Sequence, residues 1–153
     1  MKFIIEHTDE IGQQQLVYIK EECSFYMGRI IDKIDIEIIV NKISLAVSKN
    51  KIVHVSGFCG LDKSMKSNYI VPKYRKGILK IEHDLKLNFA YGINTDKDDE
   101  FPIYVNTQTG WVCIGDPKKP GDAVEFINNC VAVIDNNKGF ISLWLKPHTL
   151  PKL

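Results

Sequence analysis

The sequence lacks the features that would assign it directly to several common classes of protein. Its net charge is only +1, so the overall charge gives no reason to expect binding to nucleic acid or to a membrane. No apolar run approaches the ~20 residues that a membrane-spanning helix needs. Glu6 interrupts the short apolar run at the N-terminus before it could serve as a secretory signal. These absences predict a soluble protein of the cytoplasm with no membrane partner.

Signatures of common catalytic and cofactor sites are also missing. The chain contains no GxSxG, HExxH, P-loop or GxGxxG motif. The cysteines are widely spaced and form no CxxC pair: Cys23, Cys59, Cys113 and Cys130. We expect them to be reduced and mostly buried, and their spacing indicates no zinc site. The sequence therefore predicts no metal, no cofactor and no small-molecule substrate.

The size and composition of the chain are those of one folded domain. It has 153 residues, of which 44% are hydrophobic and 25% are charged. A chain of this size buries about 68–70% of its unfolded surface, which is enough for a core of its own. No linker or repeat divides the chain. We therefore expect a single globular domain over residues 1–153.

The last third of the chain carries the strongest structural signal, two β-hairpin patterns in succession. Residues 101–115 read FPIYVN-TQTG-WVCIG, and residues 123–145 read AVEFINNCVAVID-NNKG-FISLWL. In each case two β-branched or aromatic runs flank a turn that ends in glycine, at Gly110 and Gly139. This pattern predicts an antiparallel meander at the C-terminal end.

Shorter strand signals occur earlier in the sequence. Apolar or alternating residues predict strands at 1–7, 34–38 and 79–82. A further hairpin is expected over residues 43–56, with Asn50 at the turn position that favours a left-handed backbone. Three irregular segments, 57–77, 94–100 and 116–121, separate these strands, and long irregular segments are where function is usually located.

An N-terminal helix is predicted over residues 13–33, packed on the sheet. Thr8 can cap its start. Apolar side chains then follow at gaps of mostly three and four residues, as on one face of a helix: Leu16, Ile19, Cys23, Tyr26, Met27, Ile30, Ile31 and Ile34. A strand at residues 16–19 is the competing interpretation. With the hairpins, the helix gives a β-rich α+β fold class.

Basic residues dominate the segment from Asp62 to Lys80. They are interleaved with Tyr69 and Tyr74: Lys63, Lys66, Lys73, Arg75, Lys76 and Lys80. Such a mixture can contact phosphates and stack on bases, which gives a nucleic-acid-binding domain using the Lys63–Lys76 loop as one alternative. Arginine is scarce, however, and arginine makes most of the bidentate contacts of specific readers. The composition therefore does not favour a nucleic-acid partner, and a solvated lysine-rich loop is the preferred interpretation of the segment.

An acidic cluster is formed by Asp96, Asp98, Asp99 and Glu100. It is not an EF-hand, because the loop has no central glycine and its twelfth residue, counted from Asp96, is Thr107. It is either a solvated turn or a contact for a basic partner surface. The candidate partner-binding residues are thus Asp96, Asp98, Asp99, Glu100, Lys73, Arg75 and Lys76.

Cys59 and His54 are the best candidates for nucleophilic catalysis. A cysteine nucleophile needs a base within hydrogen-bonding distance and a third group that orients this base. Five residues of separation do not establish that geometry. A small enzyme using Cys59 and His54 is therefore a second alternative, and the sequence favours a protein that is not an enzyme.

Four stretches of the chain resemble small bacterial immunity proteins, which are encoded beside contact-dependent and other polymorphic toxins. They are VHVSGFCG, VPKYRKGILKIE, FPIYVNTQTGWVCIGD and AVEFINNCVAVIDNNKGFISLWLKP, and the resemblance spans residues 43–147. It implies a non-enzymatic protein that binds one cognate toxin domain. Such a protein neutralises the toxin by covering its active site or by blocking a required motion. Against a nuclease with a basic cleft, the acidic turn at 96–100 would be the contact.

Overall fold

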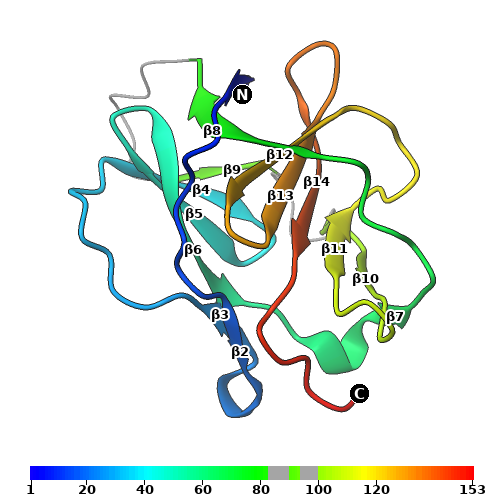
Figure 1. Cartoon of the computed structure of the whole chain (residues 1–153). Coiled ribbons are helices and arrows are strands. Elements are labelled where there is room, and N and C mark those ends of the chain that lie inside the picture. Colours follow the sequence, from blue (N-terminus) through cyan, green and yellow to red (C-terminus); the bar gives the residue numbers. More distant parts are fainter. Residues whose placement is uncertain (83–89, 94–99) are drawn as a thin grey trace.

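The computed structural model describes residues 1–82, 90–93 and 100–153, and the regular secondary structure of this part of the chain is almost entirely β-strand (Figure 1). In chain order these are β1 (Phe3–His7), β2 (Val17–Ile19), β3 (Ser24–Tyr26), β4 (Ile36–Val40), β5 (Ile43–Ser48), β6 (Lys51–Phe58), β7 (Met65–Lys66), β8 (Arg75–Ile81), β9 (Ala90–Gly92), β10 (Ile103–Val105), β11 (Val112–Gly115), β12 (Asp122–Ile127), β13 (Cys130–Ile134) and β14 (Phe140–Leu145). Single turns of 3-10 helix occur at η1 (Lys20–Glu22) and η2 (Leu61–Lys63). The prediction of a β-rich fold is therefore confirmed.

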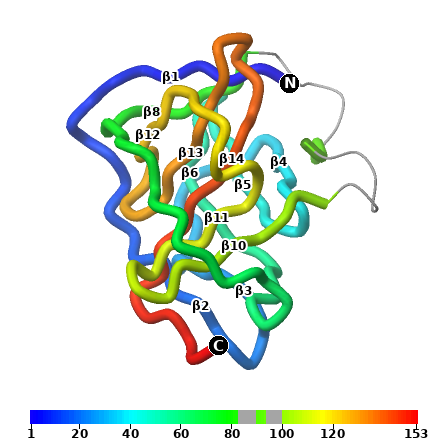
Figure 2. Tube along the Cα trace, turned by 90° about the vertical axis from the view of Figure 1, so that its right-hand side faces the viewer, coloured from blue at the N-terminus to red at the C-terminus, as the bar shows by residue number. Residues whose placement is uncertain are grey.

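The strands form one curled, mixed sheet in the order β7-β10-β11-β14-β13-β12-β8-β6-β5-β4-β9. β1 pairs with β8, and the β2–β3 hairpin is attached to β6. Most neighbours are antiparallel, but β7–β10, β8–β12 and β4–β9 are parallel pairs. The C-terminal segment runs beside β2, where the His148 N–H donates to the Leu16 carbonyl at 2.8 Å (Figure 2).

The expected hairpins form where the turn residue has a left-handed backbone. Asn50, between β5 and β6, has a φ of 64°, and Gly110, which precedes β11, has a φ of 85°. β5 pairs with β6, and β10 pairs with β11, both antiparallel. The strands expected at 1–7, 34–38 and 79–82 overlap β1, β4 and β8. These predictions are therefore confirmed. They could be made because short alternating runs and the turns between them are local signals in the sequence.

The predicted C-terminal meander is only partly right. β12, β13 and β14 follow one another as antiparallel neighbours, but β11 lies beside β14 instead of β12. The four strands thus have the order β11-β14-β13-β12, which is a Greek-key arrangement. Every residue of β11 is buried, so this strand needs neighbours on both edges and takes β10 and β14. A hairpin pattern in the sequence cannot specify which hairpin edges pair.

The predicted N-terminal helix is wrong, and with it the α+β class. Residues 13–33 contain β2, η1 and β3, and no α-helix occurs in the described parts of the chain. Cys23 breaks any helix with a left-handed φ of 50°. The apolar positions do not share one face either, because Ile30 and Ile31 are 40% and 93% exposed. The competing interpretation, a strand at 16–19, is confirmed by β2.

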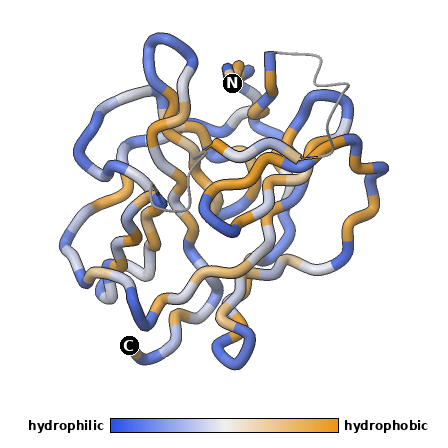
Figure 3. Tube along the Cα trace, turned by 180° about the vertical axis from the view of Figure 1, so that it is seen from behind, coloured by the Kyte–Doolittle hydropathy of each residue, from blue (hydrophilic) through white to orange (hydrophobic). Residues whose placement is uncertain are grey.

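Two apolar clusters lie on opposite faces of the C-terminal strands. The inner core fills the curl of the sheet and combines residues from both halves of the chain, among them Ile38, Leu45, Leu79, Ile114 and Leu143. The outer core lies on the other face and contains Trp111, Cys113, Val131, Val133, Ile141 and Trp144. Figure 3 shows hydrophobic stretches concentrated along the strands and hydrophilic ones at the outer turns. No helix among the described residues is long and apolar enough to cross a membrane.

Candidate functional site

Residues 67–76, here called the strap, cross the outer face of the C-terminal strands, from the end of β7 to the first two residues of β8 (Figure 1). Two backbone contacts hold the start of the strap on β10 and the turn that follows it. The Ser67 N–H donates to the Val105 carbonyl at 2.8 Å. The side-chain amide of the buried Asn106 donates to the Tyr69 carbonyl at 3.0 Å. The strap is therefore fixed to the sheet.

Aromatic rings hold the strap along the rest of its length. Tyr69 packs edge-on against Tyr104, with ring centroids 5.1 Å apart and an interplanar angle of 86°. Tyr74 packs against Trp111 at 6.2 Å and 64°. Val71 packs on the outer core between these two contacts. Edge-to-face aromatic pairs of this kind stabilise their geometry beyond simple burial.

The solvent side of the strap combines apolar and basic side chains. Ile70 is 74% exposed and Tyr74 is 37% exposed. Lys73, Arg75 and Lys76 are exposed beside them, and none of these three forms an ion pair with a residue that the structure describes. Burial, followed by the charge of Glu125, raises the pKa of Tyr74 above its ordinary value of 10.0. This is a positively charged surface with an apolar centre.

Glu100, the acidic candidate that the structure describes, does not lie on this surface. Asp96, Asp98 and Asp99 lie outside the described residues. Glu100 is exposed and lines a separate cleft, to which Lys73, Arg75 and Lys76 contribute nothing. Arg75 and Lys76 instead line a polar hollow with His7, Thr8 and Asp9. The structure thus brings together the basic candidate residues and separates them from Glu100.

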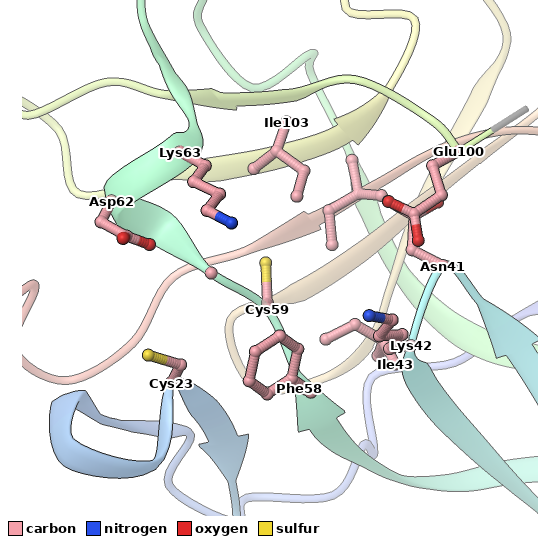
Figure 4. A pocket seen from close by; sticks show the side chains of 12 residues that line it. Cys23, Asn41, Lys42, Ile43, Phe58, Cys59, Asp62, Lys63, Glu100 and Ile103 are labelled. Atoms are coloured by element: carbon pink, nitrogen blue, oxygen red, sulfur yellow. The ribbon is translucent and has the colours of Figure 1, made fainter. Parts of the chain in front are cut away.

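The cleft with Glu100 has a volume of about 360 Å³ and opens between β5, β6, η2 and β10 (Figure 4). Its floor is apolar, since buried side chains of Ile43, Cys59 and Ile114 reach it. Charged side chains stand around it from opposite walls: Lys42, Asp62, Lys63 and Glu100. Lys42 lies over the ring of Phe58, 5.3 Å from its centroid.

Cys59 is buried in this cleft and its thiol is held protonated. Burial, with smaller effects of Cys23 and Glu100, raises the pKa of Cys59 to about 12. The thiolate is the reactive form of cysteine, and it is scarce at neutral pH when the pKa is this high. His54 does not line the cleft; its Nε2 is 2.9 Å from the Gly28 carbonyl oxygen. The geometry therefore does not bring the candidate nucleophile and base together.

Cys23 is a neighbour of Cys59 that sequence reasoning missed. The Cys59 N–H donates to the Cys23 carbonyl at 2.8 Å, which extends the pairing of β3 with β6. Positions 23 and 59 are far apart in the sequence, so no spacing rule could find them. All four cysteines are free, and three of them are buried. Among the described residues, no group of three or more cysteine, histidine or carboxylate side chains could hold a metal ion.

Sequence and family comparisons give no relatives from which a function could be transferred. No protein-family model and no curated protein matches this chain.

Proposed function

We propose that this is a non-enzymatic binding protein of the immunity type, which neutralises a cognate bacterial toxin domain in the cytoplasm by direct contact. One observation carries the proposal. The strap presents an exposed isoleucine, Ile70, and a half-exposed tyrosine, Tyr74, on a backbone that the sheet holds in place. A single exposed apolar side chain is ordinary on a protein surface, so it is the combination of Ile70, Tyr74 and basic residues on one ordered segment that supports the proposal.

The strap has the composition of an interface centre. Tyrosine and arginine are enriched among the residues that carry most of the binding energy. Tyr74 and Arg75 adjoin each other there, and Ile70 supplies apolar area. Because the strap is already ordered by its contacts with Tyr104 and Trp111, binding would cost little conformational entropy.

Charge would select the partner. Lys73, Arg75 and Lys76 favour an acidic region on the toxin, and complementary charge mainly raises the association rate and rejects wrong partners. In this proposal the acidic residues Asp96, Asp98, Asp99 and Glu100 form a second contact, with a basic region of the toxin. A toxin surface of mixed charge would satisfy both.

The product of the adjacent gene is the partner to test. The protein should bind it in a pull-down and should protect cells that express it. Ile70→Asp should weaken the binding by about tenfold or more, since a charge in an interface centre is costly to desolvate. Ile31→Asp is the matched control, because Ile31 is 93% exposed at a position away from the strap.

The outcomes test the immunity function and the role of the strap separately. If the wild-type protein neither binds the adjacent gene product nor protects against it, the immunity function is wrong. If the wild-type protein binds and Ile70→Asp binds equally well, the function stands and the strap is not its centre. Equal losses in Ile70→Asp and Ile31→Asp would also argue against the strap.

A further inference from the structure

A hollow beside the strap is separate from the Cys59 cleft and has different lining residues. It is an open hollow of about 540 Å³ between β10, the 116–121 loop and the start of β14. Its walls contain the half-buried rings of Tyr69, Phe101, Tyr104 and Phe140, and its rim carries Lys118 and Lys119. Sites for small ligands typically have volumes of about 300–1,000 Å³, and the hollow falls within this range.

The aromatic walls are held in place by one another. Tyr69 packs on Tyr104 with centroids 5.1 Å apart, and Phe101 packs on Phe140 at 5.5 Å and 46°. Tyr104 belongs to β10 and Phe140 to β14, so the rings stand on the sheet itself. None of the four rings is fully buried. The hollow therefore offers preformed aromatic surface to a planar ligand.

The loop that carries the lysines is also fixed. The Asp116 side chain accepts hydrogen bonds from the Lys118 and Lys119 N–H groups, at 2.9 and 3.3 Å. Gly115, just before it, has a φ of 124°, and a Cβ there would collide with the Ile141 carbonyl oxygen. The loop can therefore approach β14 closely only because residue 115 is a glycine.

The two lysines leave positive charge available at the rim. Neither forms an ion pair with a residue that the structure describes. The Lys118 ammonium lies 5.9 Å from the centre of the Tyr69 ring, so one cation and one ring wall are adjacent. Among the described residues that line the hollow, Asp116 is the one with a carboxylate, and this group accepts hydrogen bonds from two backbone N–H groups of its own turn.

From this arrangement we propose that the hollow binds a nucleotide unit, with its base against the aromatic walls and its phosphate at Lys118 and Lys119. Stacking on aromatic rings accepts any base, and lysine contacts phosphate as a point charge without the bidentate geometry of arginine. The scarcity of arginine therefore does not weigh against this mode of binding. The unit is either a free nucleotide or an unpaired nucleotide of a single strand. This inference does not rest on the proposed immunity function.

The experiment titrates the protein with AMP, with a fluorescent deoxythymidine octamer, and with a fluorescent octamer in which no nucleotide carries a base, all in about 25 mM salt. Binding is measured by calorimetry for AMP and by fluorescence anisotropy for the octamers. The intact octamer should bind more tightly than the abasic one by about tenfold, because the abasic strand has no base to stack in the hollow. Its affinity should fall with rising salt, because phosphate contacts release counterions.

Protein variants test the site itself. Lys118→Glu with Lys119→Glu should weaken binding by tenfold or more and reduce the salt dependence. Both side chains are exposed, so folding should be unaffected. Lys2→Glu with Lys33→Glu is the matched control, since it makes the same change in net charge and both lysines are exposed and line none of the hollows described above.

Each outcome decides the proposal. Binding of AMP as tightly as the octamer supports a free nucleotide, and binding of the octamer alone supports a single strand. The proposal is overturned if neither probe binds at millimolar concentration. It is also overturned if the variant with both rim lysines replaced binds like the control with Lys2 and Lys33 replaced, or if the abasic octamer binds like the intact one.

Discussion

The hydroxyl group of Tyr18 donates a hydrogen bond of 2.6 Å to the carbonyl oxygen of Cys59, which lies 41 residues further along the chain. The same hydroxyl oxygen accepts a bond of 3.4 Å from the Leu61 N–H. One tyrosine in β2 thus holds both the end of β6 and the start of η2. This places the wall of the Cys59 cleft against the β2–β3 hairpin.

Tyr18→Phe should therefore destabilise the protein by about 1 kcal/mol, since two partners lose one hydroxyl and the shape is otherwise kept. The measurement is the free energy of unfolding from urea denaturation. Tyr26→Phe is the matched control, because Tyr26 lies on the adjacent strand, is 48% exposed and makes no side-chain hydrogen bond to a described residue. Equal values for the two variants would contradict the bridging role of Tyr18.

Alkaline conditions should destabilise the protein through its buried thiols. Burial raises the pKa of Cys59 and of Cys113 from 9.0 to about 12, and it raises the pKa of Cys130 as well. Above pH 9 the unfolded chain loses thiol protons that the folded chain keeps. This ionisation lowers the free energy of the unfolded state and so reduces the stability of the fold.

The free energy of unfolding should thus be steady up to about pH 8 and then fall towards pH 12. Each thiol contributes up to about 1.4 kcal/mol per pH unit. Urea denaturation at pH 7, 9 and 10.5 in the presence of a reductant measures this, and Cys59→Ser should make the decline less steep. Stability that stays constant to pH 11 would show that these thiols are not protected by the fold.

Gly115→Ala should cost about 2–5 kcal/mol, since overpacking adds to backbone strain. Its φ is 124°, and the new Cβ would meet the Ile141 carbonyl oxygen and the Ser142 Cα. Gly28→Ala separates the two effects. Gly28 also has a positive φ, 85°, but nothing lies within 4 Å of a Cβ built there.

The Gly28 variant should therefore lose only about 1–2 kcal/mol from the strained backbone. Thermal and urea unfolding of both variants give the comparison. If Gly115→Ala loses no more stability than Gly28→Ala, β14 must move aside to make room for the new Cβ. The close approach of β11 and β14 would then contribute nothing to stability.

Ser142→Ala should cost about 1–3 kcal/mol, because it leaves a buried indole N–H without a partner. Trp144 Nε1 donates to the Ser142 hydroxyl at 3.0 Å, and both residues are only 1% exposed. Ser44→Ala is the control, a strand serine that is half-buried and makes no side-chain hydrogen bond to a described residue. It should cost about 0.5 kcal/mol or less, and urea denaturation distinguishes the two.

Local turn chemistry made the hairpins predictable, and the lack of it explains the failure at the N-terminus. Asn50 and Gly110 stand at left-handed positions that few other residues favour, so their hairpins could be located in advance. Leu16, Ile19 and Cys23 fit a helical spacing, but the same spacing is compatible with a bent hairpin. Cys23 takes a left-handed backbone for which a cysteine gives no signal.

The strap and the aromatic hollow are formed by segments that are far apart in the sequence. The sequence alone therefore predicts only some of their residues. The basic run around Lys73 and Arg75 was visible, as was the irregular loop at 116–121. That Tyr69 would stand between that loop and Tyr104 follows from the pairing of β7 with β10, which no local pattern encodes. The sequence could not identify Ile70 as a candidate binding residue, because it does not show whether an apolar residue in a loop is buried or exposed.

The contact between Tyr74 and Trp111 gives the strap an optical consequence. Tyr74 is open to solvent on one side, while Trp111, 6.2 Å away, is only 7% exposed. A molecule that settles on the strap would alter the environment of an indole that it does not touch. The protein therefore carries its own fluorophore behind the strap, and association there can be followed by tryptophan emission without any attached dye.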